Sequence, residues 1–317
     1  MMSGTLSHRM ASNFERRLPG PVEELGTVYH DGFCVGGVSV ALSGECGADV
    51  ALVPDLLAFR AYSDFPDIRI SVAWAGKLAR AQGRRLFDSG SVWSLYECEE
   101  GFQFDFGVPI IGELPYKRLI VDEQVRRARL LLSRECFENR KEAFPLEYPL
   151  DEVLITHRLA HERGIELHGV GIVGPDGASN LFIGHSGAGK STTARLWASL
   201  HDVEILSDDR IILRGDADQI VMYGTPWHGE AAFALPASAP LQRIFVLEHG
   251  QGNVLTRLTR SQVVGELFAR SFVPFHRHEY VDSALSFLER VADTVPCYRY
   301  SFEPDERAVE RILAFRD

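Results

Sequence analysis

The sequence predicts an α/β protein in which a β-rich N-terminal domain precedes a second domain built on a mixed β-sheet. Apolar and polar residues alternate at positions 68–74 and 102–106, which is typical of half-buried strands. Further along, an apolar run at 181–183 leads through a glycine-rich loop into a segment that reads as helix as far as residue 200. A charged stretch with two prolines at 137–149 lies between these regions and indicates a linker.

These signals divide the chain into three parts. Residues 1–22 are expected to form a flexible tail, residues 23–140 a β-rich accessory domain, and residues 141–317 the domain that contains the glycine-rich loop. Turn signals separate the strands of the accessory domain, and residues 91–106 read as a hairpin that closes on Glu99, Glu100 and Gly101. We therefore expect the accessory domain to be antiparallel.

Composition narrows the class of protein. The chain has 317 residues, 45% of them hydrophobic, and no apolar run approaches the roughly 20 residues that cross a bilayer. Its net charge of −11 argues against a general nucleic-acid or membrane-surface binder. The first 17 residues lack the hydrophobic core of a secretory signal. Five scattered cysteines without C-x-x-C spacing indicate reduced thiols in a cytoplasmic protein and no zinc site.

The glycine-rich loop matches the phosphate-binding pattern G-x-x-x-x-G-K-[ST]. Its glycines allow backbone N–H groups to turn toward one anion, and the following helix adds its positive dipole end. Lys190 would bring a charge to the β- and γ-phosphates, and Ser191 a hydroxyl to Mg²⁺. The chain has only four lysines, so a chance match is rare, although a glycine-rich turn without a ligand fits the same letters. The predicted nucleotide-binding residues are Gly184, His185, Ser186, Gly187, Ala188, Gly189, Lys190, Ser191 and Thr192.

Two adjacent carboxylates, Asp208 and Asp209, follow the next apolar strand. An acidic strand end beside a phosphate-binding loop is where a ligand of Mg²⁺ or of water belongs. Asp208 follows Lys190 by 18 residues, which is enough for one helix and a return. The loop at 224–230, rich in polar and turn residues, has the composition of a catalytic lid or binding loop.

At residues 184–192 and 207–210 the sequence resembles the HPr kinase/phosphorylase family, which is similar around its nucleotide site to ATP-dependent phosphoenolpyruvate carboxykinase. The strand with His168, Gly169 and Val170 completes the match, which covers about residues 150–250. In length and in the segment Pro-Trp-His-Gly-Glu at 226–230, the chain looks closest to the HPr-kinase-like proteins of peptide-modification gene clusters. The resemblance implies a P-loop kinase domain of the HPr kinase/phosphoenolpyruvate carboxykinase type with a mixed β-sheet.

The resemblance also implies a reaction. The γ-phosphate of ATP would be transferred, with Mg²⁺, to a serine hydroxyl of a peptide or protein, such as a peptide precursor or an HPr-like protein. Asp208 is expected to accept the proton of the attacking hydroxyl, while Ser191 and Asp209 serve Mg²⁺; the order within the acid pair stays open. No nucleic acid or membrane partner is expected, and a homo-oligomer is compatible with the sequence.

Four further residues complete the candidate catalytic set. His168 matches the family's strand, but a hydrogen-bonded core histidine fits equally well. His228 and Glu230 lie in the predicted binding loop, with Glu230 as a replacement metal ligand. Arg270 is a candidate for the arginine that stabilises charge on the transferred phosphate, against the alternative of a solvated helix residue.

Two other functions use the same motifs. An ATP-binding regulatory switch without a phosphoacceptor needs only one Mg²⁺ carboxylate, so it leaves the second acid unexplained. A decarboxylating carboxykinase needs additional carboxylate-binding arginines and a second metal site, for which the chain is short.

Overall fold

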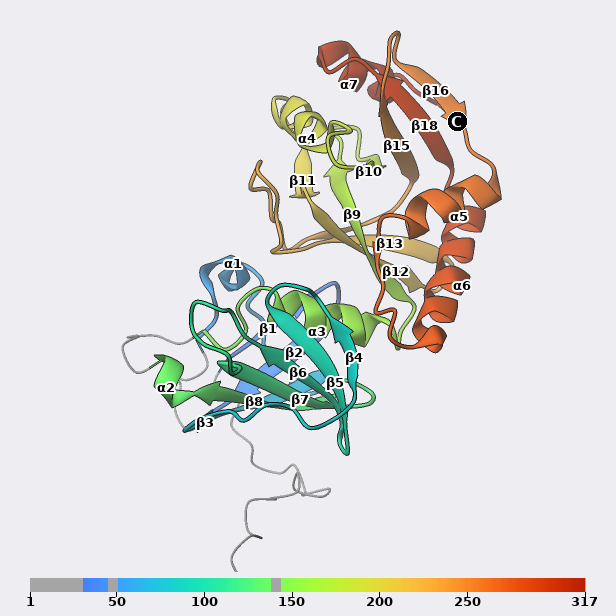
Figure 1. Cartoon of the computed structure of the whole chain (residues 1–317). Helices are drawn as coiled ribbons and strands as arrows, with labels where there is room; N and C mark the ends of the chain where they lie inside the picture. The colour runs from blue at the N-terminus through green and yellow to red at the C-terminus, as the bar shows by residue number, and fades with distance from the viewer. Residues whose placement is uncertain (1–30, 45–50, 138–143, 317) are drawn as a thin grey trace, which may run out of the picture.

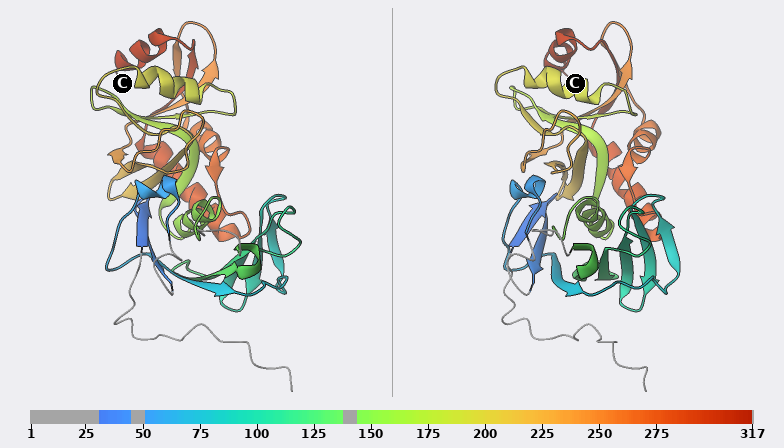
Figure 2. Two further views of the ribbon diagram at one scale, coloured as in Figure 1. Left: turned by 90° about the vertical axis from the view of Figure 1, so that its left-hand side faces the viewer. Right: turned by 60° about the vertical axis from the view of Figure 1, so that its left-hand side comes forward.

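The computed structural model describes residues 31–44, 51–137 and 144–316 of the chain. The predicted tail at 1–22, Cys46 and part of the predicted linker lie outside these residues. The described chain forms two β-sheets, with the sheet of the first half below that of the second half in Figure 1. Figure 2 shows the first sheet as a curved cradle, with one helix of the middle of the chain lying between it and the second sheet.

The first sheet has eight strands in the order β1-β2-β3-β8-β7-β6-β5-β4. The predicted hairpin is confirmed, since β5 and β6 pair antiparallel from Trp93–Phe106 to Cys98–Gly101. The expectation of an antiparallel sheet is wrong at β3, which pairs in parallel with both β2 and β8. Parallel neighbours need long connections, and the chain supplies them through helix α1 (Pro54–Leu57) before β3 and four strands after it. The strands are β1 (Asp31–Val35), β2 (Val38–Ser43), β3 (Ile68–Ala75), β4 (Arg85–Asp88), β5 (Trp93–Cys98), β6 (Gly101–Phe106), β7 (Lys117–Asp122) and β8 (Arg127–Ser133).

The second sheet has ten strands, and its main path runs β14-β13-β12-β9-β10-β15-β18-β16. It is mixed, because β10, β15 and β18 run parallel while β9 pairs antiparallel with its neighbours. The mixed α/β class predicted from the sequence is thereby confirmed, although strand β18 was not predicted. The strands are β9 (Gly164–Val173), β10 (Ser179–Ile183), β11 (Glu204–Ser207), β12 (Arg210–Asp216), β13 (Gln219–Gly224), β14 (Ser238–Pro240), β15 (Arg243–His249), β16 (Val254–Arg257), β17 (Ser271–Phe272) and β18 (Cys297–Phe302).

Six helices accompany the sheets besides α1. They are α2 (Arg134–Phe137), α3 (Leu150–Leu159), α4 (Lys190–Ala198), α5 (Arg260–Phe268), α6 (His278–Thr294) and α7 (Glu306–Leu313). Helices α5 and α6 bury apolar residues against one part of the second sheet, whereas α4 and α7 pack around Phe182, Phe245 and Tyr300. No helix within the described ranges is both long and apolar enough to cross a membrane.

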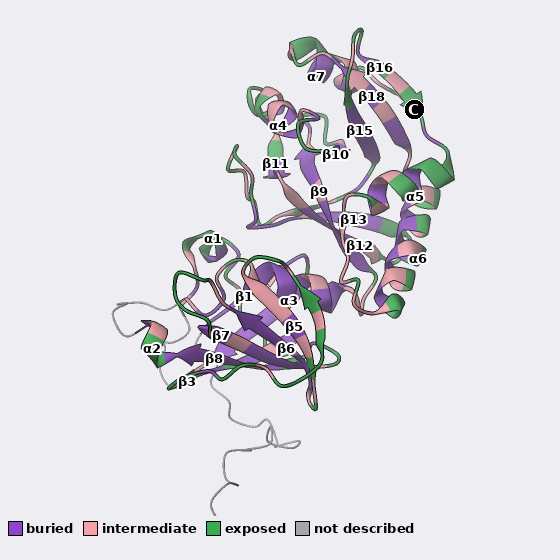
Figure 3. Ribbon diagram, viewed as in Figure 1, coloured by how far each residue is buried: buried purple, intermediate pink, exposed green. Residues whose placement is uncertain are grey.

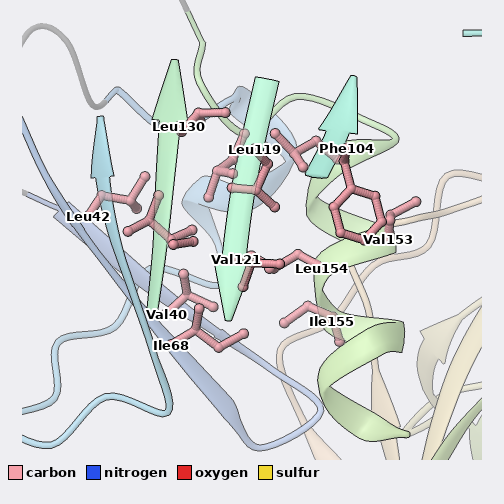
Figure 4. Packing of buried hydrophobic residues seen from close by; sticks show 14 of the residues in the cluster. Val40, Leu42, Ile68, Phe104, Leu119, Val121, Leu130, Val153, Leu154 and Ile155 are labelled. Atoms are coloured by element: carbon pink, nitrogen blue, oxygen red, sulfur yellow. The ribbon is translucent and has the colours of Figure 1, made fainter. Parts of the chain in front are cut away.

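Helix α3 belongs to the core of the first sheet. Val153, Leu154 and Ile155 lie against residues such as Leu119 and Phe104 on that sheet, as Figure 4 shows. Nearly every residue of α3 is buried, so its ribbon is mostly purple in Figure 3. The helix has apolar contacts on one side and buried acids on the other. The domain limit near residue 140 stays a prediction, but α3 itself is shared between the two sheets.

Strand β9 is a central strand of the second sheet. Its first half, through His168, pairs with β12, and its second half pairs with β11. On the opposite edge it pairs with the short β17 and then with β10. The break between β11 and β12 falls at Asp208 and Asp209, opposite the middle of β9. Because strand pairing is interrupted here, the two acids take no part in the β-ladder. They lie beside the loop that follows β10.

Candidate phosphate-binding site

The glycine-rich loop connects β10 to α4 and adopts a conformation that two of its glycines make possible. Gly187 and Gly189 have φ values of +78° and +100°, a region that disfavours other residues. At Gly189 an added Cβ would also lie 2.5 Å from Cζ of Phe302, a residue of β18. Helix α4 begins at Lys190, so its unpaired N–H groups open toward the loop. The loop therefore has the backbone of an anion cradle.

Lys190 is folded against its own loop. Its Nζ donates to the carbonyl oxygens of Gly184 (3.0 Å) and His185 (3.1 Å), and the residue is 6% exposed. Burial lowers the pKa of Lys190, and the nearby charges of Arg270 and Arg210 act in the same direction, while Asp209 opposes them. The ammonium group of Lys190 thus interacts electrostatically with Asp209, Arg210 and Arg270. An anion at the loop would compete with two neutral carbonyls for this charge.

The tip of the loop is supported by a residue that the sequence did not single out. His249, at the end of β15, has its ring Nε2 2.7 Å from the carbonyl oxygen of Gly187. Its ring stacks on Phe302, with centroids 6.1 Å apart. His249 thus connects the end of β15 to the tip of the loop.

Asp208 is buried within the protein. It is 1% exposed, and its two oxygens accept backbone N–H groups from Gly229 (3.0 Å), Ala231 (2.9 Å) and Phe233 (3.2 Å). The carboxylate thus closes the loop at 229–233 onto the acid turn. Oδ1 accepts two of these bonds and Oδ2 one, so most of the acceptor capacity of Asp208 is used by backbone, and its role as proton acceptor stays a prediction.

Asp209 has a different environment. Its side chain is 28% exposed, its Oδ1 lies 2.9 Å from Nε2 of His168, and its Oδ2 accepts a hydrogen bond from Arg210. Burial works to raise the pKa of Asp209, but the hydrogen bond from His168 and the charges of Arg210 and Lys190 outweigh it and lower the pKa. Asp209 is therefore an ionised, partly accessible carboxylate whose charge acts on the lysine of the loop.

Behind Asp209 lies a second group of charges. Arg210 Nε donates to Glu152 Oε1 of α3 at 2.8 Å and lies 3.3 Å from Glu166 Oε1 of β9. Glu166 is 1% exposed, and as a carboxylate it would have no hydrogen-bond donor among the described residues. Burial, followed by the charge of Glu152, raises the pKa of Glu166 well above its usual value. A protonated Glu166 can donate a hydrogen bond to Glu152, which gives one of its two oxygens a hydrogen-bond partner.

The predicted binding loop has one buried anchor. Trp227 is 7% exposed, packs against the core of the first sheet, and donates from Nε1 to Asp151 Oδ2 of α3 at 2.8 Å. Burial raises the pKa of Asp151 to about 6, although the bond from Trp227 opposes this shift. His228 and Glu230 flank the clamped Gly229; His228 is exposed, and its Nδ1 lies 3.0 Å from the carbonyl oxygen of Gly229. Both are thus on the outer side of the loop that covers Asp208.

Arg270 lies next to the site but is held by other residues. Its NH1 pairs with Glu266 (2.7 Å) and donates to the carbonyl oxygen of that residue, while its own carbonyl oxygen accepts from the N–H of His168. Its charge acts on Lys190. The structure therefore brings Arg270, His168, Asp209 and Lys190 together from four separate segments.

The residues present fit a nucleotide with Mg²⁺. The backbone cradle and Lys190 match the charge of a phosphate chain, and Ser191 and Asp209 supply the hard oxygen ligands that Mg²⁺ requires. Within the described ranges no group of three or more histidine, cysteine, aspartate or glutamate residues is arranged to hold a metal ion. Magnesium commonly completes its coordination with substrate phosphates and water, so one carboxylate and one hydroxyl are an adequate protein share.

Sequence reasoning overlooked the charges behind the acid turn. Glu152, Glu166 and Arg210 are adjacent only because α3, β9 and β12 meet in the fold. One signal was available: Glu166 stands between Ile165 and Leu167 in an otherwise apolar strand, and a buried charge of this kind needs a partner.

Comparison with known proteins finds similarity among solved structures but no match by sequence. No protein-family profile and no curated protein matches the sequence. Among solved structures, the HPr(Ser) kinase/phosphatase from Coxiella burnetii is similar to 47% of this chain and 93% of its own, at 12% identity and a TM-score of 0.27.

Proposed function

We propose that the protein is an ATP- and Mg²⁺-dependent kinase that transfers the γ-phosphate to a serine hydroxyl of a peptide or protein. The bond between the γ-phosphate and ADP breaks, and a carboxylate of the acid turn accepts the proton of the hydroxyl. The observation that carries this proposal is the position of Asp209: an ionised carboxylate, hydrogen-bonded to His168, within electrostatic reach of the lysine of a phosphate-binding loop. Serine as the acceptor rests on the resemblance of the motifs to HPr kinases.

The residues divide the work of positioning and charge stabilisation, on which phosphoryl transfer depends. The amides of the loop and Lys190 hold the phosphates, and Arg270 adds positive charge on the same side. Ser191 and Asp209 would hold Mg²⁺, which would neutralise charge on the phosphate oxygens. His168 orients Asp209 through one of its oxygens. Asp208 holds the loop at 229–233, so that His228 and Glu230 stand at the entrance for the acceptor.

One observation favours a second function. An ATP-binding switch without phosphoacceptor leaves the second acid of the turn unexplained, but the structure gives Asp208 a task that involves no chemistry. With Asp208 committed to backbone amides, one carboxylate remains for Mg²⁺, which is all that a nucleotide switch requires.

A label-transfer experiment separates the two functions. The full chain is incubated with γ-labelled ATP, Mg²⁺ and a library of serine peptides, with serine-to-alanine copies as the matched control. The kinase proposal predicts label in serine peptides only, and its loss in Lys190→Ala together with weaker ATP binding. ATP binding without label in any peptide, precursor or protein extract would favour the switch. Unchanged ATP binding by Lys190→Ala would contradict both.

A further inference from the structure

A continuous line of charged contacts leads from helix α3 to Asp209. Glu152 on α3 accepts from Arg210 Nε at 2.8 Å, Arg210 donates to Asp209 Oδ2, and Asp209 Oδ1 lies 2.9 Å from His168. The guanidinium group also lies over the ring of Phe272, 4.3 Å from its centroid. Each oxygen of Asp209 is thus held by a different partner, which fixes the rotation of the carboxylate.

The strand register explains why this line exists. Arg210 stands directly opposite His168 in the antiparallel pair of β12 and β9, where facing side chains are close enough to interact. Glu166 follows on the same face of β9, two residues away, and Phe272 of β17 stands opposite it on the other edge. Arg210 is 16% exposed at its side chain, so these partners surround it nearly completely.

Contact with both Glu152 and Asp209 requires the separate nitrogen atoms of an arginine side chain. One nitrogen, Nε, serves Glu152, while another, NH1, serves Asp209. A lysine carries the same charge at a single point and cannot hold two carboxylates in fixed directions. Since α3 is packed into the first sheet, Glu152 ties the orientation of Asp209 to the N-terminal half of the chain.

We propose that Arg210 is a positioning residue for Asp209, and that Glu152 of α3 holds Arg210 in the orientation that directs Asp209 toward the phosphate loop. The inference rests on the proposed function for the identity of the ligand, a magnesium nucleotide. The contacts themselves are independent of any ligand.

The chain contains a matched control pair. Arg214, four residues further along β12, donates to Glu162 just beyond α3 and to the carbonyl oxygen of Gly36. It is likewise a partly buried arginine that connects β12 with the α3 region, with a side-chain exposure of 23%. It lies at the far end of the strand pair from Asp209, opposite Gly164. Substitutions in either pair, Arg210–Glu152 or Arg214–Glu162, should disturb the contact between β12 and the α3 region. Only substitutions in the Arg210–Glu152 pair should also change the orientation of Asp209.

The test measures binding of a fluorescent ATP analogue to the full chain, once with Mg²⁺ and once with EDTA. Arg210→Lys should weaken binding of the magnesium complex about ten-fold, as loss of a residue that orients a metal ligand typically does. Binding in EDTA should be unchanged, since Lys190 and the loop are intact. Glu152→Gln should show a smaller loss of the same kind, and Arg214→Lys and Glu162→Gln none. Equal loss in both pairs, or tighter binding of the magnesium complex by Arg210→Lys, would overturn the proposal.

A second measurement does not depend on nucleotide binding. In urea unfolding, Arg210→Lys in the Glu152→Gln background should cost less than in the wild type, because the two residues act through one contact. If the two substitutions had additive effects on the free energy of unfolding, the proposed contact between Glu152 and Arg210 would be refuted. A wild type that binds no nucleotide would refute the proposed function, and the unfolding cycle would then still decide whether Glu152 and Arg210 act together.

Discussion

The two sides of the acid turn provide the most instructive comparison in the molecule. On one side, Asp208 is almost inaccessible and accepts three backbone N–H groups from the loop at 229–233. On the other, Asp209 is partly exposed and surrounded by ionisable side chains, namely His168, Arg210 and Lys190. Neighbouring residues of the same type thus have opposite surroundings.

The difference shows how a turn between two strands assigns roles. The two acids lie at a bend between β11 and β12, where their side chains enter different surroundings, and only Asp209 interacts with Lys190 of the glycine-rich loop. The other must be satisfied elsewhere, and the covering loop provides amides for it. Chemical identity alone is therefore a poor guide to which acid takes part in a reaction. The following predictions test this division, from the largest expected effect to the smallest.

Replacing Asp209 should affect function far more than stability. Asp209→Asn keeps the size of the side chain but removes the charge that would hold Mg²⁺ and that acts on Lys190, so phosphate transfer should fall about 10²- to 10³-fold. The free energy of unfolding should change by less than about 1 kcal/mol, because the side chain is partly exposed. Label transfer and urea unfolding measure the two effects. Asp216→Asn, at the exposed end of β12, is the control, and equal transfer rates in the two variants would remove Asp209 from the site.

Replacing Asp208 should affect stability first. Asp208→Ala leaves three backbone N–H groups without their acceptor, and each unsatisfied donor costs about 1–3 kcal/mol if it stays buried. We expect the free energy of unfolding to fall by about 3–5 kcal/mol, less if water reaches the loop. Limited proteolysis should show faster cleavage within 229–233. A variant with wild-type stability and no transfer activity would reverse the roles of the two acids.

The contrast between sealed and accessible groups extends to the histidines. His157 on α3 is buried, stacks on His276 at 5.2 Å, and has no partner for Nε2 among the described residues. Burial lowers the pKa of His157 to about 3, with the charge of His276 acting in the same direction; burial and then Arg277 lower the pKa of His276 to about 4. His161 and Tyr280 complete the surroundings.

The lowered pKa values of His157 and His276 predict that the protein loses stability at acidic pH. A folded-state pKa below the unfolded value of 6.5 means that the unfolded chain binds protons more readily, so stability is complete above pH 6.5 and declines as the pH falls toward 4 and 3. His157 alone should cost on the order of 2 kcal/mol at pH 5. Urea unfolding of the wild type and of His157→Phe at pH 7, 6 and 5 checks this. An identical pH slope in the two proteins would contradict the assignment.

The smallest effect concerns the anchor of the binding loop. Trp227→Phe keeps an aromatic ring in the core of the first sheet but removes the donor to Asp151, which should cost about 1 kcal/mol. The pKa of Asp151, about 6 in the wild type, should rise further because the bond from Trp227 lowers it. Unfolding at pH 5 and pH 8 measures this, since the cost should be larger at pH 8, where Asp151 is ionised. A cost that is the same at both pH values would mean that only packing was lost.

Local patterns in the sequence were sufficient for much of the second domain. The glycines, Lys190 and the apolar strand before them specify a strand, loop and helix over a short stretch, and these elements occur as β10 and α4. Strand β18 was overlooked although Tyr298, Tyr300 and Phe302 alternate with Arg299 and Ser301, which is a strand-like pattern. The parallel pairing of β3 could not be foreseen, since neighbours in a sheet are chosen by contacts between distant segments.

The sequence by itself determined the chemical groups available for phosphate binding and placed two carboxylates after the following strand. Only the tertiary structure decided that Asp209 faces Lys190 while Asp208 holds a loop, and that Glu152 and Arg210 lie behind them. The physical reason is that the glycine-rich loop is made by backbone geometry within nine residues, whereas the environment of an acid is made by every segment packed around it. Burial, partners and orientation therefore depend on α3, β9 and β12 meeting at one place.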